Sequence, residues 1–331
     1  MLTLGNKSGK IILLFILKMR KERHHSAPAF KEDRILTWIN NGEESRELLE
    51  FLTEKGKQFS RTDLKSWLKH GQIMVNGEVT TSFNAPVDPG SEVKANTSRQ
   101  FIRLRHPRLK LIYEDDDVIV VEKGYGLLSV GIPNPSKKKI ESAYDILRDY
   151  LKKKDPRNKL FVVHRLDRDT TGVMMFAKNQ EAMETLRHNW NNYVLERLYV
   201  ALLEGFVKDD EGTVKSHLAE NSQYVVYSTQ EKEQGKLAVT RYKVLGRGNG
   251  LSLVEFTLDT GRKNQIRVHA ADLGHPISGD RKYGAKHNRL GRLCLHARTL
   301  RFAHPVTKKD MYFESPVPTS FVRAAGQSKN V

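Results

Sequence analysis

Asp167 stands between two arginines in a short polar segment, residues 164–172, that separates two apolar stretches. These stretches, residues 160–163 and 173–176, have the composition of buried strands. We therefore predict that the polar segment is a loop at a sheet edge, where rigid strands commonly hold catalytic groups. A carboxylate in such a loop is suited to nucleophilic attack or to assisting an elimination. An Arg–Asp pair that only caps a turn has the same sequence pattern.

Later segments complete a pattern that begins with the His-Arg-Leu-Asp sequence of residues 164–167. They are, in chain order, Arg197–Gly205, Thr260–His269, Gly274–Asp280 and Leu293–Ala297. Together they resemble the blocks of the RluA-type pseudouridine synthases, over roughly residues 102–318. The resemblance implies an isomerase that breaks the bond from N1 of uracil to ribose, turns the base, and joins C5 to the same sugar carbon. No cofactor is implied, since nothing is added to the nucleoside.

The resemblance also implies roles for individual side chains. Asp167 is the expected catalytic aspartate, and Arg267 is expected to pair with it and keep it ionised. Tyr199 matches the active-site tyrosine, whose ring can support the base and whose hydroxyl can assist proton movement. Arg165 matches the residue that fills the gap left by the flipped base, because its planar cation can stack and donate hydrogen bonds. Arg262 is an expected contact of RNA phosphate.

Two departures from the family pattern affect the surroundings of these residues. Lys263-Asn264 replaces a pair that is commonly Thr-His or Lys-His, and Gly124 follows Lys123 where the family usually has proline. Gly124 must therefore supply a turn without the fixed torsion of proline. Near Arg267, on what resembles the start of a helix, Gln265 and His269 are compatible with phosphate contact or with a purely structural role.

Potential metal ligands are present, but their spacing does not predict a metal site. The histidines in question are His164, His269, His275 and His296. They match neither a His-x-x-x-His helix nor a Cys/His finger, and the family needs no metal. Asp115–Asp117 reads as an acidic turn between strands. Two other functions stay open: a catalytically silent RNA-binding or ribosome-assembly factor, and a Mg²⁺-dependent nuclease using Asp167, Asp169 and the acidic turn.

The composition favours a folded protein with a polyanionic partner. Of 331 residues, 38% are hydrophobic, and 56 Lys and Arg against 39 Asp and Glu give a net charge of +17. Such a surplus favours nucleic acid through counterion release. We expect RNA as the partner, with ribosomal RNA foremost and tRNA as the alternative. A basic surface that is merely solvated would give the same count.

The expected location is the cytoplasm, and the expected state is a monomer. Cys294 is the only cysteine, which excludes an intramolecular disulfide and a cysteine-based zinc site and suits a reducing compartment. The apolar run Ile11–Leu17 is shorter than the ~20 residues that cross a bilayer, so no membrane association is predicted. Residues 1–42 are predicted to be a flexible basic extension. Met19 is an alternative start, which would leave residues 1–18 outside the native protein.

A small RNA-binding domain is predicted for residues 43–99. Helical patterns at 47–55 and 60–71 precede an Asn-Gly hairpin at 73–79, an order that resembles the RNA-binding domain of the ribosomal S-four type. Along the second helix a basic stripe recurs at every fourth residue and would face phosphates. The stripe consists of Arg61, Lys65 and Lys69. A solvated helix face would have the same pattern.

The catalytic domain is predicted to span residues 100–318 and to be followed by a C-terminal tail, residues 319–331. Its expected helices are 140–151 and 180–192, and its expected strands are 198–207, 236–245, 251–258 and 293–303. Strand follows strand too often for a parallel βαβ protein. We therefore expect an α+β fold like that of the pseudouridine synthases, with a mixed, largely antiparallel sheet and flanking helices, preceded by the small α/β RNA-binding domain.

Overall fold

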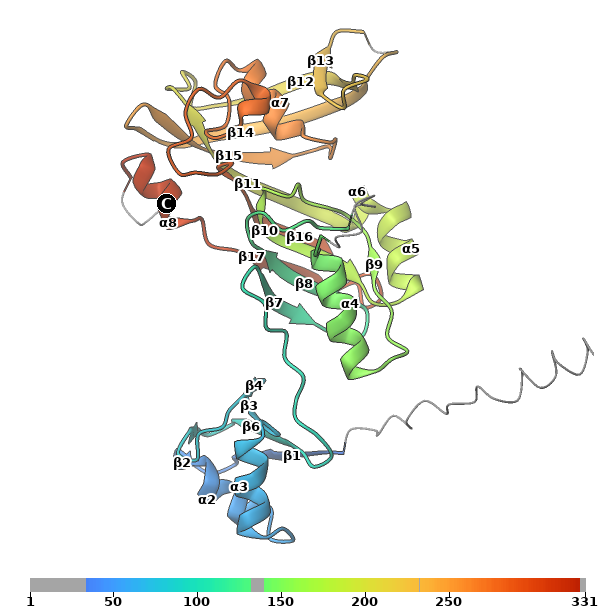
Figure 1. Ribbon diagram of the computed structural model, residues 1–331, viewed down its shortest axis with the longest axis vertical. Coiled ribbons are helices and arrows are strands. Elements are labelled where there is room, and N and C mark those ends of the chain that lie inside the picture. The colour runs from blue at the N-terminus through green and yellow to red at the C-terminus, as the bar shows by residue number, and fades with distance from the viewer. Residues whose placement is uncertain (1–33, 132–139, 232, 328–331) are drawn as a thin grey trace, which may run out of the picture. The chain divides into compact units, whose positions relative to one another are not determined.

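The chain divides into two compact units, Met1–Phe101 and Ile102–Val331, in a computed structural model that describes residues 34–131, 140–231 and 233–327 (Figure 1). The apolar run Ile11–Leu17 and the alternative start at Met19 lie outside the described residues. No helix in the described ranges is long and apolar enough to cross a membrane.

The smaller unit packs two helices against a sheet. Its elements are β1 (Ile35–Ile39), β2 (Arg46–Glu47), α2 (Leu48–Lys55), α3 (Arg61–Lys69), β3 (Ile73–Val75), β4 (Glu78–Val79), β5 (Pro86–Val87) and β6 (Glu92–Asn96). The main sheet has the order β1-β6-β3-β4. Ser60 begins α3 with a capping box to Asp63, and Asn76 and Gly77 take the positive φ angles that the tight turn requires. Phe51 and Leu68 lie in the shared core.

One boundary predicted for this unit is wrong. Residues 35–39, expected within a flexible extension, form β1 and pair antiparallel with β6 from Ile35 to Ile39. Leu36 and Trp38 pack on the core, whereas Ile35 and Ile39 are about half exposed. The strand is stabilised by a partner about sixty residues away, as the pairing of Ile35 with Asn96 shows, so local sequence gave little indication of it.

The larger unit is built on one extended sheet. Its strands are β7 (Leu109–Glu114), β8 (Val118–Lys123), β9 (Phe161–Val162), β10 (Thr171–Ala177), β11 (Val194–Glu204), β12 (Glu211–Glu220), β13 (Val226–Thr229), β14 (Lys236–Gly248), β15 (Leu251–Leu258), β16 (Leu295–Ala303) and β17 (Asp310–Glu314). The order is β13-β12-β14-β15-β11-β16-β10-β8-β7, with β17 paired to β16 and β9 paired to β10. Every named strand pair of this sheet is antiparallel except β10 with β16. The predicted α+β class with a largely antiparallel sheet is therefore confirmed.

Helices cover both halves of this sheet. They are α4 (Ala143–Lys154), α5 (Gln180–His188), α6 (Trp190–Tyr193), α7 (Gln265–Asp272), the 3-10 turn η1 (Arg281–Tyr283) and α8 (Thr319–Ala324). Figure 1 shows α4 and α5 beside β8 to β10, and α7 beside the half that contains β14 and β15. Leu147 of α4 packs with Met174 of β10, and Ile266 of α7 packs with Phe256 of β15.

Gly172 permits the close contact between β10 and β16 within the large sheet. Gly172 of β10 lies opposite Ala297 of β16, and a Cβ on Gly172 would lie 2.0 Å from the Ala297 carbonyl oxygen. Its φ of +114° is also a conformation that other residues rarely adopt. Ala297 in turn pairs with Tyr199 on β11. The close approach at Gly172 thus brings the loop before β10 next to the strand that carries Tyr199.

The prediction of a C-terminal tail at residues 319–331 is wrong for residues 319–324. Residues 319–324 form α8, whose Phe321 and Val322 are buried in the same core as Leu251 and Phe256. The helix is short and depends on this tertiary packing, so its local sequence does not resemble an isolated helix. Residues 328–331, at the end of the predicted tail, lie outside the described residues.

Candidate active site

The loop that carries Asp167 is anchored on both sides of the carboxylate. Leu166 is buried, its amide donates to Ser129 Oγ at 3.1 Å, and Ser129 Oγ donates to the Leu166 carbonyl at 2.6 Å. The Thr170 amide donates to the Asp167 carbonyl at 3.2 Å, which closes a turn before β10. Asp167 itself keeps 32% of its side chain exposed. The backbone is therefore held in place while the carboxylate faces open space.

Lys123, at the end of β8, holds the same loop through hydrogen bonds to backbone carbonyls. Its side chain is completely buried, and its ammonium donates to the carbonyls of Leu127 and Arg168 at 2.9 Å and of Gly124 at 3.2 Å. Burial lowers the pKa of Lys123 to about 8, although the charge of Asp169 opposes this shift. An ammonium has three N–H donors, so the charged form satisfies all three carbonyls. The sequence identified this lysine only as the residue before Gly124 and assigned it no role.

Arg267 on α7 reaches Asp167 across the cavity, and a second carboxylate holds it there. Its Nη1 lies 3.4 Å from Asp167 Oδ2, whereas Asp280 accepts from Nε at 2.6 Å and from Nη2 at 2.7 Å. Asp280 is buried, and the ring of Tyr283 lies 4.9 Å from the guanidinium carbon. Burial acts to lower the pKa of Arg267, but the hydrogen bonds and charge of Asp280 outweigh it and raise the pKa. The stronger partner of Arg267 is thus Asp280, which sequence reasoning included in a block without a role.

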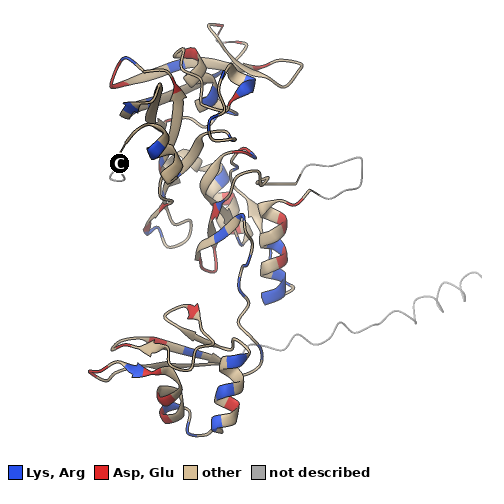
Figure 2. Ribbon diagram, turned by 60° about the vertical axis from the view of Figure 1, so that its left-hand side comes forward, with Lys and Arg blue, Asp and Glu red and all other residues tan. Residues whose placement is uncertain are grey.

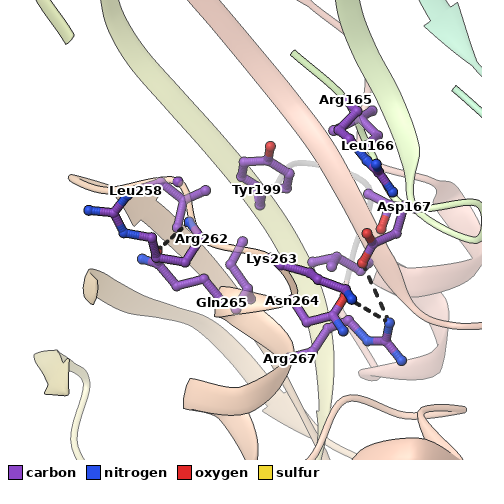
Figure 3. A pocket seen from close by; sticks show the side chains of 14 residues that line it. Arg165, Leu166, Asp167, Tyr199, Leu258, Arg262, Lys263, Asn264, Gln265 and Arg267 are labelled. Carbon is purple, nitrogen blue, oxygen red and sulfur yellow. Dashed lines mark hydrogen bonds and ion pairs between the residues drawn. The ribbon is translucent and has the colours of Figure 1, made fainter. Parts of the chain in front are cut away.

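The loop before α7 is held by buried side chains. Gln265 accepts from Thr260 Oγ1 at 2.8 Å and from the Arg262 amide at 3.0 Å, and it donates to Val239 and Thr240 on β14. Asn264 at the N-cap of α7 has a φ of 55°. Its Oδ1 accepts from Arg267 Nη1 at 3.3 Å (Figure 3). Asn264, where the family commonly has histidine, thus contacts Arg267 through its amide oxygen.

His269 is also structural. It is completely buried, and its ring nitrogens contact Thr240 Oγ1 at 2.8 Å and Ser216 Oγ at 3.0 Å. Both nitrogens therefore have protein partners. Of the two interpretations that the sequence left open for Gln265 and His269, the structure places both residues in the support of α7 and not on the surface.

Tyr199 lies on β11 and lines the cavity beside Asp167 (Figure 3). Burial raises the pKa of its phenol, and the charge of Asp167 adds to this effect, while Arg197 opposes it. The hydroxyl is therefore protonated at neutral pH. A protonated phenol beside a carboxylate can donate a hydrogen bond or exchange a proton with a bound molecule.

The cavity between these side chains has a volume of about 350 Å³. Its lining brings together Arg165, Asp167, Tyr199, Arg262 and Arg267, all predicted from the sequence. This volume lies within the range of small-molecule pockets, which is roughly 300–1,000 Å³. Arg165 and Arg262 are exposed at the cavity. One anionic group and several cations thus surround a space that can accept a nucleobase and sugar.

The basic stripe belongs to the other compact unit. Arg61, Lys65 and Lys69 are all exposed on α3, along which Lys and Arg recur in Figure 2. Each is therefore accessible to solvent and to a large anion. Their participation in RNA binding stays a prediction.

Among the described residues, Asp115, Asp117 and His304 form a group with three potential metal ligands. Asp115 accepts from the amides of Asp117 and Val118 and from Tyr113 Oη at 2.8 Å, and it contacts His304 Nε2 at 3.0 Å. His304 Nδ1 accepts from the Thr307 amide at 3.0 Å. These bonds account for the arrangement as a hydrogen-bonded turn.

Comparisons with known proteins give consistent matches. A family model described as RNA pseudouridylate synthase matches residues 117–272. An uncharacterized RNA pseudouridine synthase of Bacillus subtilis, YlyB, is 33% identical over 280 residues, which cover 83% of this chain and 92% of that protein. The ribosomal large subunit pseudouridine synthase D of Xylella fastidiosa is 33% identical over 303 residues, covering 85% and 88%. The counterpart from Pasteurella multocida is 31% identical over 293 residues, covering 82% and 87%.

A solved structure is also similar. Human RNA Pseudouridylate Synthase Domain Containing 1 has a TM-score of 0.52 and 26% identity, and the match covers 65% of this chain and 87% of the human chain.

Proposed function

This chain belongs to the RluA-type family of RNA pseudouridine synthases and is an RNA-modifying isomerase, and we propose that Asp167 is the residue on which its catalysis depends. The observation that carries the proposal is the position of Asp167. Its carboxylate lies at the wall of the cavity, 3.4 Å from an arginine that Asp280 holds in place. In a chain that only bound RNA, no carboxylate would be needed at that point.

The target uridine leaves its stack and enters the cavity, as bases do in other enzymes that modify them. Asp167 then attacks the sugar carbon or assists an elimination that yields a glycal. By the first route a bond from Asp167 to the sugar carbon replaces the bond to N1, and it breaks again when C5 of the turned uracil attacks. By the second route the bond to N1 and a C–H bond of the sugar break, and the sugar regains a proton as C5 adds to the glycal. In both routes C5 forms the new bond and then loses its proton. Arg267 orients Asp167 and stabilises its charge.

Tyr199 acts on the base and Arg165 on the surrounding RNA. The Tyr199 ring supports the uracil while it turns, and the protonated hydroxyl assists proton movement near the sugar. Arg165 occupies the gap that the extruded uridine leaves, and its planar cation contacts the orphaned bases. Arg262 contacts phosphate at the cavity entrance. This sequence of events uses only groups of the protein and of the substrate, without a cofactor or metal.

Ribosomal RNA of the large subunit is the substrate that we propose, with tRNA as the alternative. Two relatives with 31% and 33% identity bear the name ribosomal large subunit pseudouridine synthase D. The net charge of +17 and the stripe Arg61, Lys65 and Lys69 suit a large structured RNA. We propose that the enzyme acts as a monomer in the cytoplasm, where ribosomes are assembled.

The test is release of tritium from RNA that carries [5-³H]uridine, because the C5 hydrogen is lost only when the new bond forms. The RNA is isolated from cells that lack the gene, and the assay contains a chelator. We expect release with intact strands, and pseudouridine mapping should then locate the modified position in large-subunit rRNA. Strand cleavage that requires Mg²⁺ would indicate a nuclease, and binding without release would indicate a catalytically silent factor.

A further inference from the structure

A second cavity adjoins the first and has not been used in the account above. Its volume is about 420 Å³. The two cavities share Arg165, Tyr199, Leu258, Gly261 and Arg262 as a common wall. The far side of the second cavity comes from α5, α6 and the start of β11, which contribute Arg187, Trp190 and Arg197 among others. A molecule that occupies both cavities at once would therefore pass directly over Tyr199.

Cationic side chains line this cavity without any carboxylate. Its arginines are Arg165, Arg187, Arg197 and Arg262, and no Asp or Glu is among the lining residues. Among the described residues, none of these arginines has a carboxylate oxygen within 4.0 Å. Elsewhere in the same unit exposed arginines do have such partners, as Arg241 has Asp259 and Arg301 has Asp310. The cavity thus gathers four arginines in one place without a carboxylate among its lining residues.

One of these cations, Arg197, is held where burial disfavours its charge. It is half-buried, and a hydrogen bond of 3.0 Å joins its Nη2 to the carbonyl of Leu258. Burial lowers the pKa of Arg197, and Tyr199 and then Asp259 oppose this only in part. Asp259 is itself bonded to Arg241. Burying a cation without a carboxylate is unfavourable, so a bound anion would relieve the cost.

The loop opposite Arg197 is shaped to leave room for it. A Cβ on Gly261 would lie 2.6 Å from Arg197 Nη1, so a larger residue at this position would displace the guanidinium. Gly261 belongs to the same loop as Arg262, whose Nε donates to the Leu237 carbonyl at 3.0 Å. Both arginines are thus oriented by backbone carbonyls, which fix a guanidinium without neutralising its charge.

We propose that this second cavity binds a phosphodiester group of the RNA strand immediately beside the target uridine. The inference rests on the proposed function, since it takes the first cavity as the uridine site. Guanidinium groups match the geometry of phosphate oxygens and stay charged at all physiological pH values. The shared wall at Tyr199 places the phosphate within a nucleotide or two of the extruded base. Binding there holds the strand on one side while the uridine is drawn into the first cavity.

Arg187 offers the cleanest test, because it is exposed, lies in the last turn of α5 and touches no catalytic side chain. Arg323 is a matched control: it is also exposed, lies in the last turn of α8 and lines neither cavity. Filter binding to rRNA from cells that lack the gene is measured at several salt concentrations for Arg187→Gln, Arg187→Lys and Arg323→Gln. Removing one phosphate contact should reduce the salt slope by about 1 and weaken binding severalfold. Arg187→Lys should keep most of the slope, and Arg323→Gln should match the wild type.

Phosphate ethylation interference then locates the contact on a transcript of the segment in which the modified uridine has been mapped. We expect ethylation of one phosphate flanking that uridine to block the wild-type protein but not to weaken Arg187→Gln any further. If Arg187→Gln had the affinity and salt slope of Arg323→Gln, or if its interference pattern differed only at distant phosphates, the inference would be overturned. Failure of the wild-type protein to release tritium would instead overturn the proposed function, and with it the uridine site on which this inference rests.

Discussion

Arg267 and Arg197 are both largely removed from solvent in the catalytic unit, yet their surroundings differ. Arg267 has a bidentate carboxylate partner in Asp280, and its pKa is raised. Within the described part of the chain, Arg197 has only a backbone carbonyl at hydrogen-bonding distance, and its pKa is lowered. The difference separates two uses of charge. A cation whose charge is balanced within the protein can position a catalytic group before RNA arrives, whereas an unbalanced one gains its partner only from the RNA.

Among variants of the charged groups that surround Asp167, the largest effect is expected from removing the balanced cation. Arg267→Ala leaves Asp280 as an unpaired buried carboxylate and Asp167 without its arginine. Removing one group that stabilises charge in an active site costs roughly 10²–10³ in rate, so single-turnover tritium release should fall by about a hundredfold or more. The double variant Arg267→Ala/Asp167→Asn should lose little beyond the slower single variant, because groups that act as a unit are not additive.

The control is Arg301→Ala, which removes an exposed arginine paired with Asp310 on β17 and should leave the rate within twofold of wild type. Clean multiplication of the single-variant effects in the double variant would show that Arg267 acts apart from Asp167.

A smaller loss of rate is expected for Asp280→Asn. This change keeps the shape of the side chain but removes the charge that fixes Arg267. Charge-assisted hydrogen bonds contribute about 1.5–3 kcal/mol, so the rate should fall by roughly ten- to a hundredfold. The loss should be in the rate at saturating RNA and not in affinity. If affinity fell and the rate did not, Arg267 would serve RNA binding in the same way as Arg197.

Lys123→Met should show the cost of a buried cation that has only carbonyl partners. Burial holds the folded-state pKa of Lys123 at about 8, below the ordinary lysine value of 10.5, so the unfolded chain binds the proton more tightly. Stability of the wild type must therefore rise as pH increases from about 8 towards 10.5, where the charge is lost. Relative to Lys123→Met, the free energy of unfolding of the wild type should increase by roughly 2 kcal/mol between pH 7 and pH 9.5. Denaturant unfolding at both pH values measures this, and an unchanged difference would contradict it.

The smallest effect is expected in the other unit, where the basic stripe is fully exposed. Lys65→Gln should lower the salt slope of rRNA binding by about 1 and leave the rate at saturating RNA unchanged, because the predicted catalytic side chains all lie beyond residue 101. Lys55→Gln on α2, outside the stripe, serves as the control. Equal slopes for the two variants would leave the stripe without a role in RNA binding.

Local patterns predicted the elements whose stability is local. The start of α3 after Ser60 and the turn at Asn76 and Gly77 were found from residue types alone, and 251–258 coincides with β15. β1 and α8 were missed, because each is stabilised by residues distant in the sequence.

In the active site, too, some features could be predicted from the sequence and others depend on distant contacts. Family resemblance identified Asp167 and Arg267, which are 100 residues apart, but not the clamp from Asp280 or the support from Lys123. Whether a charged side chain has a partner depends on three-dimensional contacts, and so the unpaired arginines of the second cavity were not recognisable from residue type.

The most direct test of the account is the single-turnover rate of Asp167→Asn at saturating RNA, measured together with its affinity for the same RNA. The amide preserves the size of the side chain and removes the group that attacks the sugar or assists the elimination. The cations around the cavity are unchanged, so RNA binding should persist within a few-fold. We predict no detectable tritium release beside near-normal binding. Residual turnover of more than a few per cent would contradict the assignment of Asp167 as the catalytic residue.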